Sequence, residues 1–194
     1  MRLNHSAKGI ARTALCMAFV VLWLSCGCVN CEGQQREGLE VRRKALFIVR
    51  ILEFVEWPAA GTRKPLEFCV VGDSFLTFAM AESVRGATIR ERKVELRSVS
   101  RGEQLKGCEA VYFSGQIRGP LSKWLAKVDP APVLTFGETD EFLKSGGLVQ
   151  LVCENDRMRF QVNLNAVRES HLHIDARLLE LAGRGRAERE LGNR

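Results

Sequence analysis

Two histidines and an aspartate near the C-terminal end of the chain have side chains that could bind a metal ion. The run His171-Leu172-His173 is followed by Asp175. Imidazole and carboxylate groups are ordinary zinc ligands. Two histidines on an exposed loop are, however, more often incidental surface residues. We favour the surface interpretation and expect no metal site here.

A serine that follows a predicted strand is the next residue with possible chemistry. Ser114 lies in Tyr112-Phe113-Ser114-Gly115-Gln116, which lacks the first glycine of a nucleophile elbow. The sequence also contains neither a GxGxxG fingerprint nor a P-loop. We therefore expect no enzymatic activity and no cofactor.

The chain has seven cysteines, and whether their thiols stay free or form disulfides depends on the compartment. Residues 1–28 have the features of a signal peptide: a basic start, the apolar run Ala14–Leu24, and the small residues Ser25 and Gly27. The apolar run is shorter than the ~20 residues that a transmembrane helix needs. We expect export to the periplasm, where thiols tend to pair.

Cys26 and Cys28 allow an alternative, a lipid-anchored protein. A lipid-bearing cysteine follows a short motif with leucine three residues upstream, and neither cysteine has that leucine. Simple cleavage between Gly27 and Glu32 is preferred. In the folded part of the chain, Cys69, Cys108 and Cys153 form an odd set, so at most one bridge joins two of them.

The formal net charge of +6 lies mainly at the two ends of the chain. Residues 29–183 carry nearly equal numbers of basic and acidic side chains, whereas 184–194 are rich in arginine. This distribution does not support a nucleic-acid partner. We expect residues 29–40 to be a linker, 41–182 to be the domain, and 183–194 to be a flexible basic tail.

Apolar periodicity predicts that the domain is built from alternating strands and helices. Val41–Val55 has the stripe of a mostly buried helix, which Pro58 ends because proline disfavours helical geometry in the residue before it. The chain after it has predicted strands at 66–71, 93–98, 110–113 and 133–136 and predicted helices at 75–84, 121–128 and 140–144. Such alternation implies a largely parallel sheet.

The end of the domain has a hairpin pattern. Residues 148–153 and 158–163 flank the turn Glu154-Asn155-Asp156-Arg157, and short helices are predicted at 164–168 and 175–181. The expected fold is a single α/β domain. Its mixed, mostly parallel sheet is flanked by helices in a Rossmann-like manner and has a C-terminal β-hairpin at one edge.

The chain resembles the YfiR family through short motifs that occur in the family's order. The first is Lys44-Ala45-Leu46-Phe47-Ile48, continued by Phe54-Val55-Glu56-Trp57-Pro58. Further matches are Phe68-Cys69-Val70-Val71-Gly72-Asp73, Gly107-Cys108 before Val111-Tyr112-Phe113, Val133-Leu134-Thr135, Phe142 with Gly146-Gly147, Phe160 with Asn163-Leu164, and Leu178-Leu179. Their combined order is the specific part of the resemblance.

This resemblance implies a periplasmic regulator that binds the sensory part of an inner-membrane diguanylate cyclase and restrains cyclic di-GMP synthesis. The alternative is a small-ligand sensor or solute-binding module coupled to a membrane histidine kinase or receptor. A lined cavity at the carboxyl ends of the strands, around Gly72-Asp73-Ser74, Ser114-Gly115 and Phe136-Gly137, would favour that alternative.

The family's cysteine pattern maps onto Cys69 and Cys108 and so implies a disulfide between them. If the strands take the order 2-1-3, the strand that bears Cys69 lies beside the strand that Cys108 leads into, and neighbouring strands are ~4.8 Å apart, which is within disulfide reach. Two buried free thiols are the alternative. Cys153 has no second cysteine nearby, so the hairpin bridge of other members is expected to be absent.

The first helix supplies the candidate partner-binding residues Leu46, Phe47, Val49 and Trp57. Trp57 has two interpretations, an interface anchor or a plug of the core, and the adjoining Pro58 favours the core. The apolar surface of the helix is likewise either buried by the domain or left for a partner. A homodimer is a further candidate assembly. Contact with the membrane is expected only through the partner or a lipidated cysteine.

The leader analysis predicts that the mature protein lacks residues 1 to about 28 and resides outside the cytoplasm. Mass spectrometry of the N-terminus checks this expectation. An intact Met1 on cytoplasmic protein would contradict it, whereas lipid on Cys26 or Cys28 would support the lipoprotein alternative.

Overall fold

The computed structural model describes residues 31–58, 64–86, 88–100, 105–128, 132–154 and 157–183, with side chains from residue 38 onward. The leader, the two lipidation candidates and the arginine-rich residues 184–194 lie outside the described residues. The chain divides into two compact units, Met1–Glu40 and Val41–Arg194. Among the described helices, none is both long and apolar enough to cross a bilayer.

The second unit is organised around a seven-stranded sheet with the order β3-β4-β2-β5-β6-β7-β8. The strands are β2 (Leu66–Val71), β3 (Thr88–Ile89), β4 (Arg92–Val99), β5 (Ala110–Phe113), β6 (Leu134–Gly137), β7 (Val149–Glu154) and β8 (Arg157–Val162). The strands from β4 through β7 pair in parallel, whereas β3 and β8 pair antiparallel at the two ends. The mixed, mostly parallel α/β fold and the hairpin edge are therefore confirmed.

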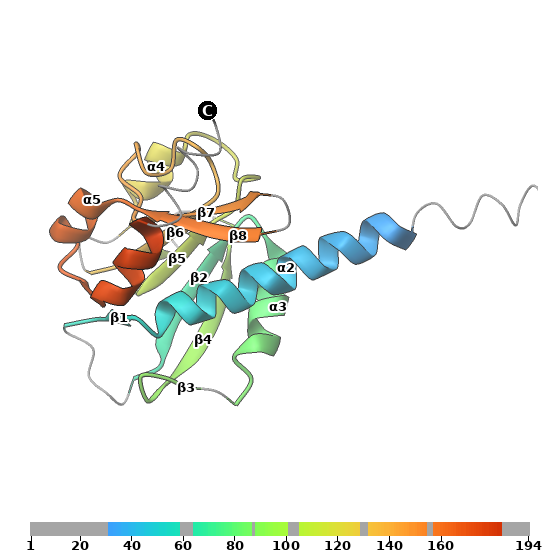
Figure 1. Cartoon of the computed structure of the whole chain (residues 1–194), viewed down its shortest axis with the longest axis horizontal. Helices are drawn as coiled ribbons and strands as arrows, with labels where there is room; N and C mark the ends of the chain where they lie inside the picture. Colours follow the sequence, from blue (N-terminus) through green and yellow to red (C-terminus); the bar gives the residue numbers. More distant parts are fainter. Residues whose placement is uncertain are drawn as a thin grey trace, which may run out of the picture. The chain divides into compact units, whose positions relative to one another are not determined.

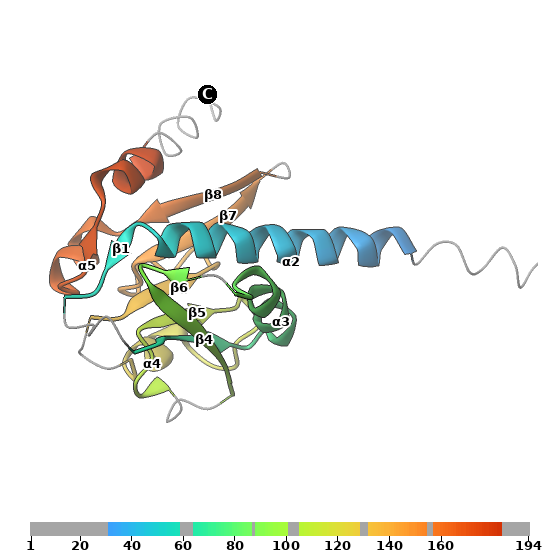
Figure 2. The same ribbon diagram turned by 90° about the horizontal axis from the view of Figure 1, so that it is seen from below.

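Helices cover both faces of this sheet, which explains why the central strands are apolar throughout. Figures 1 and 2 show α2 (Cys31–Leu52) and α3 (Ser74–Ser83) on one face and α4 (Leu121–Leu125) on the other. Side chains alternate between two core clusters: Phe68 and Tyr112 face α2, whereas Val111 and Phe113 face α4. Every residue of β5 is consequently buried.

Both ends of the first helix differ from the prediction. Helix α2 begins at Cys31 rather than Val41, so part of the expected linker is helical; residues 31–40 contain three Glu and two Gln, which favour helices. It ends at Leu52 because Val55–Glu56 form a strand, β1, that pairs antiparallel with β9 (His173–Ile174). A pairing across so many residues leaves no trace in local periodicity.

Two other segments depart from the sequence pattern. Residues 140–146 form successive turns instead of the expected helix. The hairpin between β3 and β4 was missed because its turn residues, Arg90 and Glu91, have positive φ angles of 50° and 65° without the usual glycine or asparagine. The last helices, α5 (Leu164–Glu169) and residues 176–183, lie close to their predicted positions.

The turns at 140–146 hold a phenylalanine between two glycines. The Phe142 ring is fully buried in the second core cluster. A Cβ atom at position 137 would lie 2.1 Å from Phe142 Cδ2, and one at position 147 would lie 2.2 Å from Phe142 Cε1. The Phe142 ring therefore fits between Gly137 and Gly147 only because neither residue has a side chain. We call this space the Phe142 slot.

Gly137→Ala is expected to lower the free energy of unfolding by about 1–3 kcal/mol, because the added methyl overpacks the Phe142 slot. Urea unfolding followed by circular dichroism measures the change. The matched control is Gly115→Ala, whose Cβ would lie 3.7 Å from Glu138 Oε2, an ordinary contact. Equal stabilities for the two variants would contradict the proposed role of Gly137.

Candidate functional site

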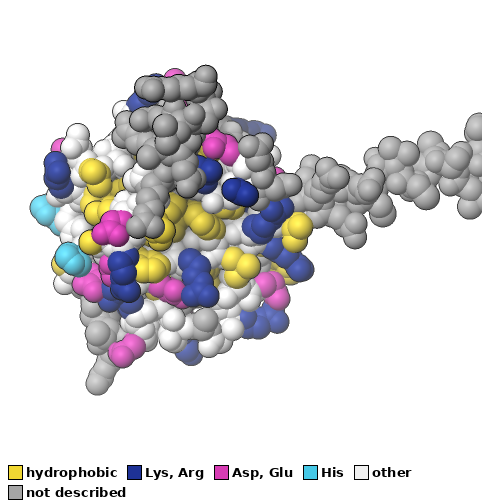
Figure 3. All heavy atoms as spheres, viewed as in Figure 1, with side chains coloured by type: hydrophobic (Ala, Val, Ile, Leu, Met, Phe, Trp, Pro, Cys, Tyr) yellow, Lys and Arg dark blue, Asp and Glu magenta, His cyan; other side chains and the backbone are white. Residues whose placement is uncertain are grey.

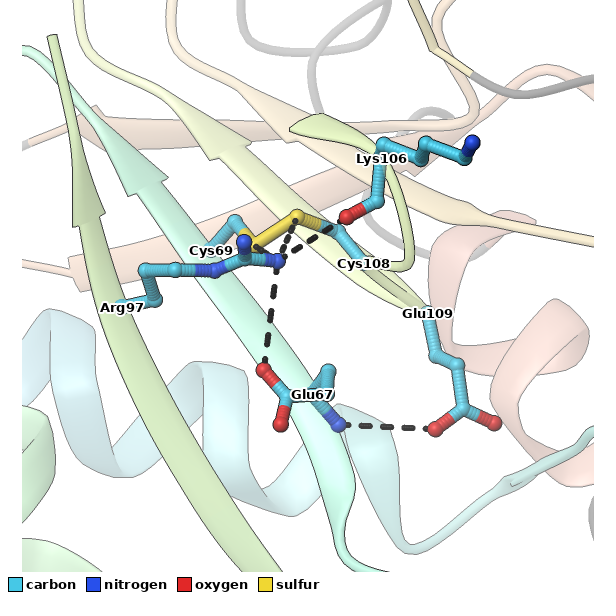
Figure 4. Close-up of a disulfide and its surroundings, with 6 residues drawn as sticks. All are labelled: Glu67, Cys69, Arg97, Lys106, Cys108 and Glu109. Atoms are coloured by element: carbon cyan, nitrogen blue, oxygen red, sulfur yellow. Dashed lines mark hydrogen bonds and ion pairs between the residues drawn. A yellow bond between two sulfur atoms is a disulfide. The ribbon is translucent and has the colours of Figure 1, made fainter. Parts of the chain in front are cut away.

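A disulfide joins the middle of β2 to Cys108, which lies two residues before the start of β5. Cys69 and Cys108 have Cα atoms 5.9 Å apart, and both side chains are buried. Strand β2 lies between β4 and β5, so the conditional 2-1-3 order of the sequence argument is the order observed. The structure thus contains the bridge that the family resemblance implied, and Figure 4 shows its surroundings.

An arginine guanidinium lies over this disulfide. Arg97 on β4 is in register with Cys69, and its Nη2 lies 3.4 Å from Cys69 Sγ and 3.2 Å from Cys108 Sγ. The same nitrogen donates to the backbone oxygen of Lys106 (Figure 4). A cation beside sulfur atoms stabilises a thiolate. Reduction of this bridge would therefore leave at least one thiol with a cationic neighbour.

Carboxylates gather on the same side of the bridge. Glu67 Oε2 lies 3.9 Å from Arg97 Nη2, and the backbone nitrogen of Glu67 donates to Glu109 Oε2 (Figure 4). Burial raises the pKa of Glu67; Arg97 opposes this increase, and the neighbouring Glu95 and Glu109 add to it. The single guanidinium of Arg97 is therefore surrounded by several carboxylates near the disulfide.

A second ion pair is buried at the amino ends of the strands. Arg92, which is 6% exposed, donates from Nη1 to Glu109 Oε1 at 3.0 Å and from Nη2 to Glu109 Oε2. Its Nε and Nη2 also donate to the backbone oxygens of Lys64 and Pro65. The charge is thus both paired and hydrogen-bonded, as a buried guanidinium requires.

Trp57, one of the four candidate partner-binding residues, is part of the core. Its side chain is 8% exposed, and its Nε1 donates to the backbone oxygen of Glu109 at 3.0 Å. Of the two interpretations of Trp57 that the sequence left open, the structure agrees with a buried core residue rather than an exposed interface anchor. Trp57 thereby attaches the end of β1 to the start of β5.

The other three candidates lie on α2 but differ in exposure. Leu46 is 55% exposed, whereas Phe47 and Val49 are half-buried and pack against the first core cluster. Phe47 packs edge-to-face on Phe160 of β8, with ring centroids 5.7 Å apart. Of these three candidates, only Leu46 is therefore presented to solvent as a large apolar side chain.

Cationic side chains flank Leu46 along the helix. Arg42 and Arg50, four residues before and after it, are exposed, and residues four apart share a helix face. Figure 3 shows hydrophobic side chains grouped among Lys and Arg on the face that α2 crosses. We call Arg42, Leu46 and Arg50 the α2 stripe. Its chemistry suits a partner surface that combines an apolar spot with acidic groups.

At the carboxyl ends of two central strands, β2 and β6, apolar side chains pack against glycines. Ile117 Cγ2 lies 3.1 Å from the place of a Cβ at Gly72, and the Phe142 ring occupies the space beside Gly137. The N-terminus of α3 is capped by Asp73, whose carboxylate accepts from Leu76 N at 2.8 Å. In addition, Lys44 of α2 forms an ion pair with Glu138 just beyond β6.

The serine, aspartate and histidines considered in the sequence analysis do not form a common site. Ser114 is 4% exposed, and its Oγ accepts from Gln116 N. Asp175 binds Arg177, whose hydrogen bonds lower the pKa of Asp175 to about 2, while His171 and His173 are exposed. In the part of the chain that the structure describes, no three His, Cys, Asp or Glu side chains are grouped to hold a metal ion.

Sequence reasoning found the two cysteines and Trp57 but missed the polar groups around them. Glu67 and Glu109 each lie between apolar residues, whereas Arg92 and Arg97 have polar neighbours on at least one side, and both patterns are usually read as solvent-facing positions. Cys153 is exposed and free in the structure. A protein-family model described as YfiR/HmsC-like matches residues 42–183, which include the disulfide, the buried ion pair and the α2 stripe.

Replacing both bridge residues, as Cys69→Ala with Cys108→Ala, is expected to lower the free energy of unfolding by ~4 kcal/mol, because the bridge closes a loop with a sequence separation of 39. Urea unfolding measures the loss, and peptide mapping without reductant tests the bond. Cys153→Ala is the control and should leave stability nearly unchanged, since that thiol is exposed. Free thiols at positions 69 and 108 in exported protein would refute the bridge.

Proposed function

We propose, because the chain belongs to the YfiR/HmsC-like family, that it is a periplasmic binding protein which restrains a membrane-bound signalling enzyme. The proposed enzyme is a diguanylate cyclase of the inner membrane, and the effect is lower cyclic di-GMP synthesis. The family match carries this proposal because it covers residues 42–183, nearly all of the second unit.

The packing of the sheet supports binding through a surface. Small ligands of open α/β sheets bind beyond the carboxyl ends of the strands. In this chain Ile117 packs against Gly72 and Phe142 against Gly137 at those ends, and Asp73 accepts a hydrogen bond from Leu76 N at the N-terminus of α3, where an anion could otherwise bind. These contacts favour a protein-binding regulator over the alternative, a small-ligand sensor coupled to a histidine kinase or receptor.

The side chains with nucleophilic or acidic chemistry support a regulatory role without an active site. The Ser114 hydroxyl accepts a bond from a neighbouring backbone nitrogen and is buried, and Asp175 is held by Arg177. A nucleophile requires a base within hydrogen-bond reach of it. The proposal therefore assigns the protein no reaction of its own.

The disulfide supports the proposed compartment. Structural disulfides persist in oxidising environments such as the periplasm and are rare in the cytosol. The bridge between Cys69 and Cys108 is buried and links β2 to the segment that leads into β5. Together with the leader at residues 1–28, it supports export, with lipidation of Cys26 or Cys28 as the less favoured variant.

The α2 stripe is the proposed contact with the membrane partner. Leu46 supplies an exposed apolar side chain, and Arg42 and Arg50 supply charges at either side. Phe47 and Val49 hold α2 against the sheet by packing on the first core cluster. Trp57 holds the segment after α2 in place through its hydrogen bond to the backbone oxygen of Glu109. In this arrangement, among the residues of α2, only those of the stripe itself touch the partner.

Leu46→Glu is expected to weaken binding to the isolated periplasmic domain of the partner cyclase at least tenfold, because burying a leucine is worth ~1.5–3 kcal/mol and a buried carboxylate adds a cost. Isothermal titration calorimetry measures the affinity. The matched control, Leu164→Glu, changes a leucine of α5 that is 50% exposed and should bind normally. If Leu46→Glu folds and binds as tightly as the wild type, the proposed contact is wrong.

A further inference from the structure

Two phenylalanines of α3 face solvent. Phe75 is 78% exposed and Phe78 is 69% exposed, and no other large hydrophobic side chain in the described part of the chain is as open to water. The opposite side of α3 is packed into the first core cluster through Leu76, Ala79 and Met80. Residues three apart share a helix face, so the two rings are neighbours. An exposed apolar patch of this kind marks an interaction site.

The surface around the two rings is uncharged. Residues 74–81 contain no ionisable side chain. At the start of α3, the carboxylate of Asp73 is used as the cap that accepts from Leu76 N. At the other end, Glu82 is paired with Arg85. The first two turns of α3 therefore offer a partner apolar contact without a charge of their own.

The flank of α2 that faces α3 follows from the contacts of the opposite flank. Lys44 pairs with Glu138 just beyond β6. Phe47 packs on Phe160 of β8. Both contacts direct this flank of α2 toward the half of the sheet that contains β6, β7 and β8. Helix α3 lies on the other half, against β4 and β2, and Figures 1 and 2 show it beside α2.

Helical geometry places Arg42 on the flank of α2 that faces α3. With 3.6 residues per turn, residue 42 lies about 160° around the helix from residue 44 and about 140° from residue 47. Arg42 is exposed, and within the described part of the chain no carboxylate is paired with it. It therefore carries a free cation one turn before Leu46, on the side of α3.

On α3, the flank that faces α2 carries Phe75. Val84, at the end of α3, lines a cleft with Val94 and Leu96 of β4, so that flank of α3 faces the outer edge of the sheet. Residue 75 lies about 180° around the helix from residue 84. Phe75 is therefore on the side of α2, and Phe78 lies between the two flanks.

The α2 stripe and the two rings of α3 thus form one surface, in which Arg42 lies between Leu46 and the rings. Arg50, at the other end of the stripe, is paired with Glu53. The surface consequently offers a partner large apolar side chains and the guanidinium of Arg42. Aromatic and arginine side chains are enriched among the residues that dominate binding at protein interfaces.

We propose that this two-helix surface, the α2 stripe with Phe75 and Phe78, binds an amphipathic helix of the membrane partner. The inference rests on the proposed function and adds the chemistry of the bound segment. The backbone groups of α2 and α3 are engaged within the helices, so side chains hold the partner, as when an amphipathic helix packs in a groove. Apolar residues at i, i+3 and i+4 would cover Leu46 and the rings, and a carboxylate beside them would bind Arg42.

The charges of this surface argue against a lipid bilayer as the occupant. Adsorption to anionic lipid takes a cluster of several Lys or Arg side chains. Among the described residues Arg42 is unpaired, whereas Arg50 and Arg85 each have a carboxylate partner. A partner helix with one acidic residue beside its apolar stripe matches this balance.

Photo-cross-linking in cells identifies what covers the surface. The photoreactive residue p-benzoylphenylalanine is placed at position 78 of the full chain, and cross-linked peptides are sequenced by mass spectrometry. We expect a product with a segment of a membrane protein that has the apolar spacing of an amphipathic helix and an acidic residue beside it. The control position is 164, a leucine of α5 that is 50% exposed, which should not yield this product.

The identity of the product separates this inference from the proposed function. An amphipathic helix of a membrane protein other than a diguanylate cyclase would support the docking surface and contradict the cyclase as the partner. Products with lipid alone, products with a segment that lacks this pattern, or no product at position 78 would overturn the docking surface.

Replacing both rings measures their share of the binding. Phe75→Ser with Phe78→Ser should weaken binding to the periplasmic domain of the cross-linked partner about tenfold or more, because aromatic hot spots carry much of an interface's affinity. Both side chains are exposed, so the fold should persist, which circular dichroism checks. Leu164→Ser is the matched control. A double variant that binds as tightly as the wild type, while Leu46→Glu does not, would overturn the inference and leave the α2 contact of the proposed function intact.

Discussion

The buried ion pair between Arg92 and Glu109 is the interaction on which the rest of the domain depends. Arg92 opens β4 and also donates to the backbone oxygens of Lys64 and Pro65, just before β2. The backbone oxygen of Glu109 accepts from Trp57 Nε1 and from the backbone nitrogen of Leu134 at the start of β6. Because a buried charge that loses its partner costs several kcal/mol, these strands must begin together for either ion to be satisfied.

This shared starting point explains how distant parts of the chain are held together in one folded unit. With β2 and β5 held side by side, Cys69 and Cys108 are brought within bonding distance. With Trp57 attached to β5, the C-terminal end of α2 is held over the sheet and Leu46 is left on its outer face. At the far ends of β2 and β6, Ile117 and Phe142 pack against Gly72 and Gly137.

Much of this fold was predictable because buried parallel strands are continuous apolar runs. Strands β2 and β5 matched their predicted ranges, and the hairpin of β7 and β8 followed from its alternation and turn. The pairing of β1 with β9 was not predictable, since two residues at each site leave no periodic pattern. Of the candidate site, the family resemblance indicated the two cysteines, whereas Arg92 and Arg97 looked like ordinary exposed positions of a strand. Their role depends on which strands become neighbours.

Regulation through binding is the central claim, and a rate measurement tests it most directly. Membrane vesicles that carry the partner cyclase, with its sensory domain facing the medium, are titrated with the mature protein while cyclic di-GMP synthesis is followed. We expect the rate to fall in proportion to occupancy and to reach a plateau when binding is saturated. A synthesis rate that stays unchanged while the protein is demonstrably bound would contradict the proposed restraint.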